Sequence, residues 1–225
     1  MEVIKAAGNT IYIFKTKVID ANTYCFIEGN DALLIDAVQS DELQNFLLSL
    51  EIKRIAVLFT HGHYDHIMSI PNLRKQFDTV VICAESGKDI LENPRKNLSA
   101  VANHINFFRK DSIWEKEELD NIIPFRVTCD FTLNDRDVYK WKNLEFQMIC
   151  TPGHSADSVF YLFCNTYLFS GDSLLKGREP ILRFPGGNVQ DYMRYTKPII
   201  LSFPDTVEVL PGHGARFKIS EGTVL

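Results

Sequence analysis

The spacing of apolar residues along the chain predicts a fold that begins with strands. Residues 11–18, 23–28 and 32–35 are rich in β-branched and aromatic residues, and short polar stretches at 19–22 and 29–31 separate them. Runs of this kind, bounded by Asp, Asn and Gly, are typical of strands joined by turns. We therefore expect an antiparallel meander at the start of the protein.

Helix and strand signals then alternate. Ser40 fits a helix N-cap, and the apolar residues after it recur at the spacing of an amphipathic helix: Leu43, Phe46, Leu47 and Leu50. Continuous apolar runs at 55–59 and 79–84 predict strands buried on both faces, with a helix over 67–77 between them. This alternation indicates an α/β fold.

The pattern becomes helical across residues 85–124. One helix is predicted there by an apolar stripe, which consists of Leu98, Val101, Ala102, Ile105 and Phe108. Ser112 and Glu115 match a capping box and predict the start of a second helix. His104 is better explained as a partly buried residue of the first helix than as a metal ligand. We interpret this segment as a helical insertion over the sheet.

The rest of the chain returns to strands. Two hairpins are predicted over 138–150 and 158–170, each with an Asn in its turn. Asn188 fits the N-cap of a helix that Pro198 must kink or shorten. A last strand is expected over 207–210, directly before a Pro-Gly-His-Gly sequence.

Composition predicts one globular domain over residues 1–225. Hydrophobic residues make up 45% and charged residues 24% of the chain, which are ordinary globular values, and no linker or low-complexity stretch divides it. The first residues lack a basic and then apolar signal segment, and no apolar run reaches the length of a membrane span. We therefore expect a cytoplasmic protein with no membrane partner.

Charge is distributed unevenly. The whole chain carries a net charge of −5, which argues against a nucleic-acid partner. Residues 173–218 nevertheless contain seven basic and four acidic side chains, a net +3.

The cysteines are odd in number and lack the paired spacing of zinc ligands: Cys25, Cys83, Cys129, Cys150 and Cys164. Most of them lie in apolar runs. We therefore expect core thiols rather than metal ligands or disulfides.

Residues 60–67 read Thr-His-Gly-His-Tyr-Asp-His-Ile and are the densest group of metal-binding side chains in the sequence. Imidazole and carboxylate together suit a transition-metal site that protein leaves unsaturated. His61 and His63 are two apart and can point the same way, whereas Asp65 and His66 follow where a helix should begin. This spacing favours two neighbouring ions, and the alternative is that the histidines are polar residues of a surface loop.

Three later loops each follow or end a strand and offer one more ligand. Each ligand lies beside a glycine, which permits close backbone approach. The loops are Thr151-Pro152-Gly153-His154-Ser155, Ser170-Gly171-Asp172-Ser173 and Pro211-Gly212-His213-Gly214. Each signal is weak alone, but the ordered set is strong.

This ordered set resembles the metallo-β-lactamase-fold hydrolases, and within them the glyoxalase II-like group; Asn22-Thr23-Tyr24 and Leu34-Ile35-Asp36 also look like that family. The resemblance implies an αβ/βα four-layer sandwich with a dinuclear site at one edge. It implies that one ion is held by His61, His63 and His154, and the other by Asp65, His66 and His213. Asp172 would bridge them. The ions would be two Zn²⁺, with Fe or Mn as alternatives.

The resemblance also implies a reaction class. Two such ions share a hydroxide and polarise a carbonyl, so hydrolysis needs no protein nucleophile, and Asp65 would act as a catalytic residue by orienting the hydroxide or accepting its proton. For Asp36 two roles stay open: support of a metal-bound imidazole or a buried structural carboxylate.

The substrate expected from the resemblance is an acyl thioester. The chain ends soon after His213 and lacks the C-terminal helical region with which glyoxalase II holds glutathione, and it is similar to short hydrolases associated with polyketide synthases. We therefore expect acyl groups on an acyl carrier protein or coenzyme A as substrate or partner. Glyoxalase II activity, lactonase activity and a non-catalytic ligand-binding protein are the alternatives.

Two further expectations concern substrate contacts. The basic segment 173–218 lies between Asp172 and the region after His213, so its cations should attract an acidic carrier; the expected contacts are Lys176, Arg178 and Arg183. Aromatic residues of the 85–124 insertion are expected to shape the acyl pocket, among them Phe107, Phe108 and Trp114.

Overall fold

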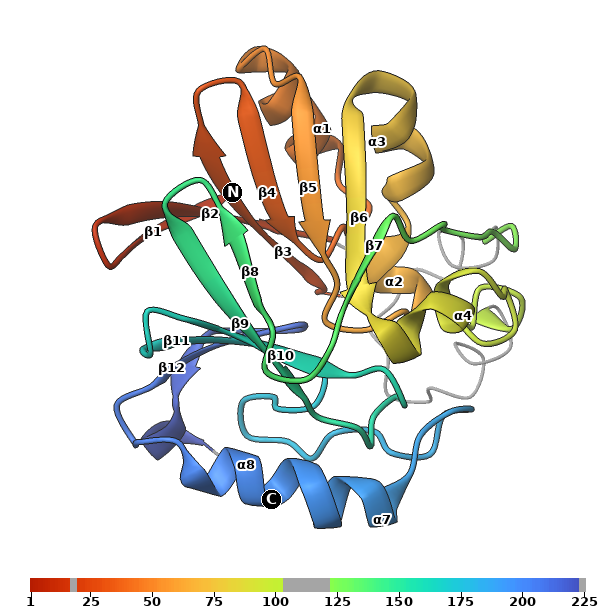
Figure 1. Ribbon diagram of the computed structural model, residues 1–225, viewed down its shortest axis with the longest axis vertical. Helices are drawn as coiled ribbons and strands as arrows, with labels where there is room; N and C mark the ends of the chain where they lie inside the picture. Colours follow the sequence, from red (N-terminus) through yellow and green to blue (C-terminus); the bar gives the residue numbers. More distant parts are fainter. Residues whose placement is uncertain (17–19, 103–121, 223–225) are drawn as a thin grey trace.

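The computed structural model describes residues 1–16, 20–102 and 122–222, and the strands within them form two sheets (Figure 1). The described part of the first sheet has seven strands, in the order β1 (Glu2–Ala6), β2 (Asn9–Lys15), β3 (Asn22–Glu28), β4 (Asp31–Ile35), β5 (Arg54–Leu58), β6 (Asp78–Ala84) and β7 (Phe131–Leu133). Strands β1 to β4 are antiparallel, as the predicted meander requires, and β4 to β7 are parallel.

The second sheet is mainly antiparallel. Its described strands are, in order, β13 (Phe217–Lys218), β12 (Glu208–Pro211), β11 (Tyr167–Gly171), β10 (Val159–Phe163), β9 (Leu144–Cys150) and β8 (Val138–Trp141). Both predicted hairpins are present, as β8–β9 and β10–β11. Only β11 and β12, among these described strands, run parallel, so both of their following loops leave at the same edge.

Aromatic packing joins the two sheets face to face. Phe26 on β3 lies 5.4, 5.5 and 6.1 Å, between ring centroids, from Phe146, Phe163 and Phe169 of the second sheet. All four rings are buried. Edge-on ring contacts of this kind add to the burial of apolar surface between the sheets.

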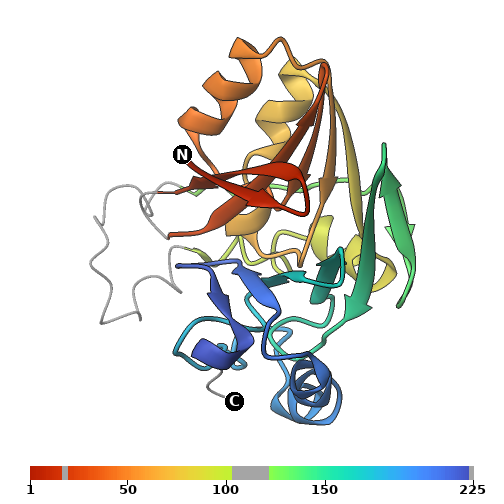
Figure 2. The same cartoon turned by 90° about the vertical axis from the view of Figure 1, so that its left-hand side faces the viewer.

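Helices cover the outer face of each sheet. The described helices of the first half are α1 (Asp41–Ser49), α2 (Tyr64–Ile67), α3 (Ile70–Gln76), the 3₁₀ turn η1 (Glu85–Gly87) and α4 (Lys88–Leu91). Those of the second half are α7 (Val189–Asp191), the π-helical turn η2 (Tyr192–Thr196), α8 (Lys197–Ser202) and the 3₁₀ turn η3 (Ile219–Glu221). Figure 2 shows the two groups on opposite sides of the strands.

The helices attach through the apolar faces expected from the sequence. Leu43 and Leu47 of α1 pack in the core outside the first sheet, and the Ser40 hydroxyl caps this helix by accepting from Leu43 N at 3.2 Å. Tyr192 and Ile200 pack in the core outside the second sheet. The order helix, sheet, sheet, helix confirms the predicted αβ/βα sandwich.

Several predicted elements differ in detail. β1, β7 and β13 were not expected, because short edge strands carry little periodic signal. The helix predicted over 67–77 is two helices, α2 and α3, of which α2 begins at Tyr64. The π-helical turn before Pro198 agrees with the predicted disturbance, because proline has no N–H for the helical ladder.

The segment 85–124 is less helical than predicted where it is described. η1 and α4 are present, but residues 92–101 form turns, in which Leu98 has a φ of 66°, and residues 122–130 contain no helix. The expectations for His104, Phe107, Phe108 and Trp114 fall in 103–121, outside the described residues. Among the residues that are described, no helix has the length and hydrophobicity needed to cross a membrane.

Candidate metal centre

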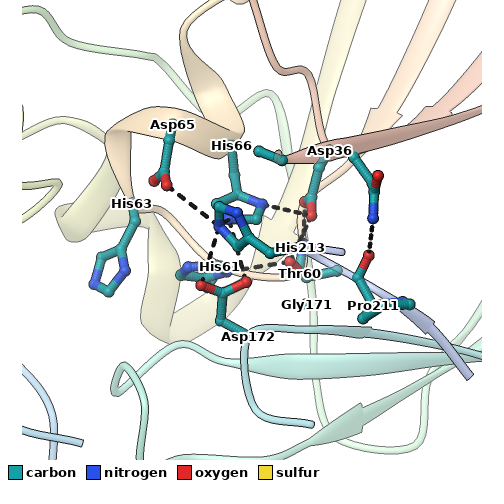
Figure 3. A network of polar contacts seen from close by, with 12 residues as sticks. Asp36, Thr60, His61, His63, Asp65, His66, Gly171, Asp172, Pro211 and His213 are labelled. Atoms are coloured by element: carbon teal, nitrogen blue, oxygen red, sulfur yellow. Dashed lines mark hydrogen bonds and ion pairs between the residues drawn. The ribbon is translucent and has the colours of Figure 1, made fainter. Parts of the chain in front are cut away.

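Loops from both sheets meet at one edge of the sandwich. His61 and His63 follow β5, and α2 then carries Asp65 and His66. From the second sheet come His154 between β9 and β10, Asp172 after β11 and His213 after β12. The structure thus brings together all seven side chains that the sequence indicated; Figure 3 labels each of them except His154.

A glycine allows two of these loops to approach closely. A Cβ atom on Gly212 would lie 2.3 Å from Asp172 Oδ1 and 2.8 Å from His66 Cε1. These distances are shorter than real Cβ contacts, so any larger residue would displace the side chains of the site. The Gly-His pattern noted in the sequence is therefore required by space around the ligand.

One group of donors consists of three buried imidazoles. Ligand atoms of His61, His63 and His154 all lie within 4.8 Å of one another, and His63 Nδ1 is 3.0 Å from His154 Nε2. His61 Nε2 is buried and has no hydrogen-bond partner among the described residues. A buried nitrogen without a partner is costly, and a cation between the three rings would remove that cost.

Hydrogen bonds on the far side of two of these rings, His61 and His154, define their tautomers. His154 Nδ1 lies 2.8 Å from the Ile181 carbonyl, so Nδ1 carries the proton and Nε2 offers its lone pair to the site. Thr60 Oγ1 donates to Asp36 and lies 3.1 Å from His61 Nδ1, which leaves the lone pair of His61 on Nε2. These are the tautomers that metal ligands need.

The second group combines Asp65, His66 and His213, whose ligand atoms also lie within 4.8 Å of one another. His213 Nε2 is 3.4 Å from Asp65 Oδ2 and 3.3 Å from His66 Nε2. On the other side of its ring, His66 Nδ1 lies 2.9 Å from Asp36 Oδ2. Asp36 is buried and also accepts from Thr60 N and Thr60 Oγ1, both at 2.8 Å, so it is a buried structural carboxylate that also holds the ring of His66.

Asp172 lies between the two groups. Its Oδ2 is 3.3 Å from His213 Nε2 in one group and 3.7 Å from His154 Nε2 in the other. It also forms a third donor cluster with His61 and His66. A carboxylate in this position could contact ions in both groups.

The two donor groups differ in the pKa values of their histidines. Burial lowers the pKa of His63 to about 3 and holds the pKa of His61 and His154 below the ordinary value. Burial would also lower the pKa of His213, but the carboxylates of Asp172 and Asp65 outweigh it and raise that pKa to about 9. Because metal ligands must be deprotonated, the first group is ready for a cation, whereas the second releases a proton when it binds one.

Asp157 supports the site and was not singled out from the sequence. It is buried, its Oδ2 accepts from Gly62 N at 2.9 Å, and its Oδ1 accepts from Ser155 Oγ at 2.5 Å. It therefore ties the loop of His61 and His63 to the loop of His154. Burial raises the pKa of Asp157 to about 6. The sequence offered one signal for Asp157, its position three residues after His154.

The predicted substrate contacts lie on the loop after Asp172. Lys176, Arg178 and Arg183 are exposed, and Lys176 Nζ lies 3.7 Å from Glu221 Oε2. The same loop supplies Phe184, whose ring centroid is 6.0 Å from that of His63 and 6.2 Å from that of His154. Arg183 is thus adjacent in sequence to a residue that borders the first group of imidazoles.

Comparison with curated proteins gives matches over most of the chain. Residues 17–213 match the Metallo-beta-lactamase superfamily. A probable metallo-hydrolase of Streptococcus pyogenes is 31% identical over 214 residues, which cover 92% of this chain and 85% of the relative. The probable polyketide biosynthesis zinc-dependent hydrolase PksB of Bacillus subtilis is 24% identical over 208 residues, which cover 90% and 78%.

Solved structures share the fold. The BLEG-1 B3 metallo-beta-lactamase superposes with a TM-score of 0.77 at 24% identity and covers 94% of this chain and 95% of its own. TTHA1623, solved in a di-iron-bound form, has a TM-score of 0.72 at 21% identity, with 93% and 95% covered. The superfamily match spans most of the sequence and agrees with the observed sandwich, so the chain belongs to the metallo-β-lactamase superfamily.

Proposed function

We propose that the protein is a metal-dependent hydrolase that cleaves acyl thioesters with two bound transition-metal ions. The observation that carries this proposal is the pair of three-residue donor groups with Asp172 between them. His61, His63 and His154 would hold one ion, Asp65, His66 and His213 the other, and Asp172 would contact both.

The donor set supports zinc as the metal, with iron and manganese as alternatives. Nitrogen and carboxylate donors suit all three metals. Of the similar proteins, PksB is named zinc-dependent and TTHA1623 is described as di-iron-bound. When bound, a pair of such ions polarises a carbonyl oxygen and generates a nucleophile from water at neutral pH.

The protein's own side chains position the reacting groups. Asp65 is proposed as the catalytic residue, because its carboxylate faces the site 3.4 Å from His213 Nε2 and can orient a water molecule or take its proton. Asp36 and the Ile181 carbonyl hold the rings of His66 and His154 in place. Phe184 supplies an apolar edge beside His63 and His154 against which an acyl chain can pack.

The proposed substrate is an acyl group on a phosphopantetheine arm, carried by an acyl carrier protein or coenzyme A in the cytoplasm. Two observations support it: the net +3 of residues 173–218, whose loop reaches the site through Phe184, and the similarity to PksB. Both carriers are acidic, so the exposed Lys176, Arg178 and Arg183 would raise the rate of encounter. Nucleic acid and membrane are not proposed as partners.

The test compares one acyl group on four thiols: carrier protein, coenzyme A, glutathione and a small uncharged thiol. We expect two metal equivalents per chain, and preference for the two acidic carriers that weakens as salt screens charges over a Debye length of about 8–10 Å. Arg183→Ala should reduce that preference, whereas Arg136→Ala, an exposed arginine beside Asp135, should not.

Each alternative has its own outcome. Preference for the glutathione thioester would favour glyoxalase II activity, and turnover of lactones alone would favour a lactonase. Two metal equivalents without turnover of any substrate would favour a ligand-binding protein. Equal rates on all four thiols, without a salt effect, would overturn the carrier assignment while leaving a metal-dependent hydrolase.

A further inference from the structure

Two cysteines far apart in the sequence lie in contact at the β7 side of the first sheet. Cys83 is on β6, Cys129 lies two residues before β7, and their sulfur atoms are 3.0 Å apart. We propose that Cys83 and Cys129 are a redox-modification site, a dithiol that a low-molecular-weight disulfide such as glutathione disulfide converts into an intramolecular disulfide. The sequence predicted core thiols; Cys83 is buried, whereas Cys164 is exposed, and the proposed modification goes beyond that prediction.

Hydrogen bonds of the residues on either side of Cys129 hold it in place next to Cys83. Asp130, the residue after Cys129, donates its N–H to the Val81 carbonyl at 2.9 Å and accepts from Val81 N through Oδ2 at 2.8 Å. On the other side, Arg74 of α3 donates to the Thr128 carbonyl at 2.9 Å. Both neighbours of Cys129 are therefore anchored, so a bond between the sulfur atoms needs no large backbone movement.

The two thiols have different access to solvent and different chemical roles. Cys83 is buried, whereas Cys129 is partly exposed. The Cys83 thiol donates a hydrogen bond to the Cys129 sulfur, which lowers the pKa of Cys129 and raises that of Cys83. Thiolate character and access favour attack by Cys129, and Cys83 is placed to resolve the product.

The exchange balances without a further reagent. Cys129 loses its proton, and its thiolate attacks one sulfur of the small disulfide, breaks the S–S bond and releases one thiolate, which takes up that proton and leaves as a thiol; a mixed disulfide remains on Cys129. Cys83 then loses its proton and attacks the Cys129 sulfur, and the second small thiol leaves with that proton. The protein dithiol is oxidised by two electrons, and the small disulfide is reduced to two thiols.

The new bond would close a loop onto a segment that is linked through Asn97 to the start of α2. Residues 122–130 return from the 85–124 segment, and the Phe125 carbonyl in them accepts from Asn97 Nδ2 at 3.0 Å. The Asn97 carbonyl in turn accepts from Tyr64 N, at the start of α2, at 2.8 Å. Oxidation would therefore fix this returning segment against β6.

The other cysteines supply a control. Among the described residues, Cys25, Cys150 and Cys164 form no hydrogen bond to another sulfur. Cys164 is exposed, so glutathione can reach it, but no second thiol is there to resolve a mixed disulfide. Cys164→Ser is thus the matched variant for a reactive but unpaired thiol.

The experiment incubates the folded, reduced full chain with glutathione disulfide and follows it by intact mass and by non-reduced peptide mapping. Cys164→Ser should lose the mass of two hydrogen atoms, whereas wild type should lose the same two hydrogen atoms and carry one glutathionyl group on the exposed Cys164. Both should yield a peptide that links Cys83 to Cys129. Cys129→Ser should form no such link. Cys83→Ala should stop with one glutathionyl group on Cys129.

Two results would overturn the proposal. One is a wild-type chain in which Cys164 carries glutathione while Cys83 and Cys129 remain reduced. The other is a cross-linked peptide that joins any different pair of cysteines. Circular dichroism of each variant checks its folding, and because Cys83 is buried, the comparison of wild type with Cys129→Ser decides the matter if Cys83→Ala fails to fold.

Discussion

Replacing Asp36 with asparagine tests whether this carboxylate controls the second donor group. Asp36 accepts three hydrogen bonds, from Thr60 N and Thr60 Oγ1 at 2.8 Å and from His66 Nδ1 at 2.9 Å. An amide has only one acceptor oxygen, so Asp36→Asn leaves at least one buried donor facing an NH₂ group. Such a donor costs about 1–3 kcal/mol of folding free energy.

The same substitution should weaken the second metal ion. Without a negative partner at Nδ1, the His66 ring is a poorer ligand and its tautomer is less well fixed. Loss of such an outer hydrogen bond typically lowers metal affinity about 10–100-fold. The affinity of the group formed by His61, His63 and His154 should change much less, because Asp36 reaches His61 only through Thr60.

Zinc titration against a competing chelator, with thermal unfolding of the same samples, measures both effects. Asp31→Asn is the matched control: Asp31 is also a buried carboxylate, but it pairs with Arg54 and Lys142 away from the metal centre. A second-ion affinity within about threefold of wild type in Asp36→Asn would refute the reasoning, because the expected loss is at least about tenfold.

Three further changes test a glycine at the site, a carboxylate beside it and a carboxylate away from it. Gly212→Ala should lower second-ion affinity in the same titration, because its Cβ would lie 2.3 Å from Asp172 Oδ1, whereas Gly222→Ala, whose Cβ would lie no closer than 3.4 Å to other atoms, should not; equal affinities would contradict the steric account. Asp157 has a pKa raised to about 6, so its ionisation should make the metal-free protein less stable as pH rises from about 4 to about 6. The free energy of unfolding, measured with urea, should therefore fall less steeply with pH in Asp157→Asn than in wild type. An equal dependence on pH in both proteins would contradict this role of Asp157. Hydrogen bonds from Arg54 and Lys142 lower the pKa of Asp31 to about 2, so its stabilising contribution should be present above about pH 4 and lost as pH falls to about 2. In Asp31→Asn the free energy of unfolding should therefore decrease less between about pH 4 and about pH 2. The same decrease in both proteins would contradict this contribution.

The sequence predicted those parts of the fold that rest on strong local signals. The central strands β5 and β6 are continuous apolar runs, and Ser40 marks the start of α1 through its own hydroxyl. Edge strands such as β7 could not be predicted, because three residues with little burial show no period. The helix predicted from the stripe Leu98 to Phe108 stays a prediction over most of its length, because 103–121 lie outside the described residues. Of the described stripe residues, Leu98 and Val101 lie in turns and Ala102 is helical.

In the site, too, only residues with a strong local signal could be predicted from the sequence. The seven proposed ligands could be singled out because a dense group of imidazoles and a carboxylate at 61–66 is followed, in order, by three loops that each place one ligand beside a glycine. The groups that hold these ligands in place could not be predicted. A backbone carbonyl such as that of Ile181 has no sequence signature, and the role of Asp157 is visible only in the fold, where it contacts both Gly62 and Ser155. The contact of Cys83 with Cys129 likewise depends on the parallel pairing of β6 with β7, which brings residues 46 positions apart together.

Neither sheet holds a complete donor group by itself. The first takes His61 and His63 from the loop after β5 and His154 from the β9–β10 loop; the second likewise combines Asp65 and His66 with His213. Of each three-residue group, the N-terminal one of two polypeptide fragments cut between β7 and β8 would therefore carry two donors and the C-terminal one would carry one. Metal ions would favour their reassembly by mass action, so fragment complementation should become metal-dependent even though the sheets meet through an apolar interface.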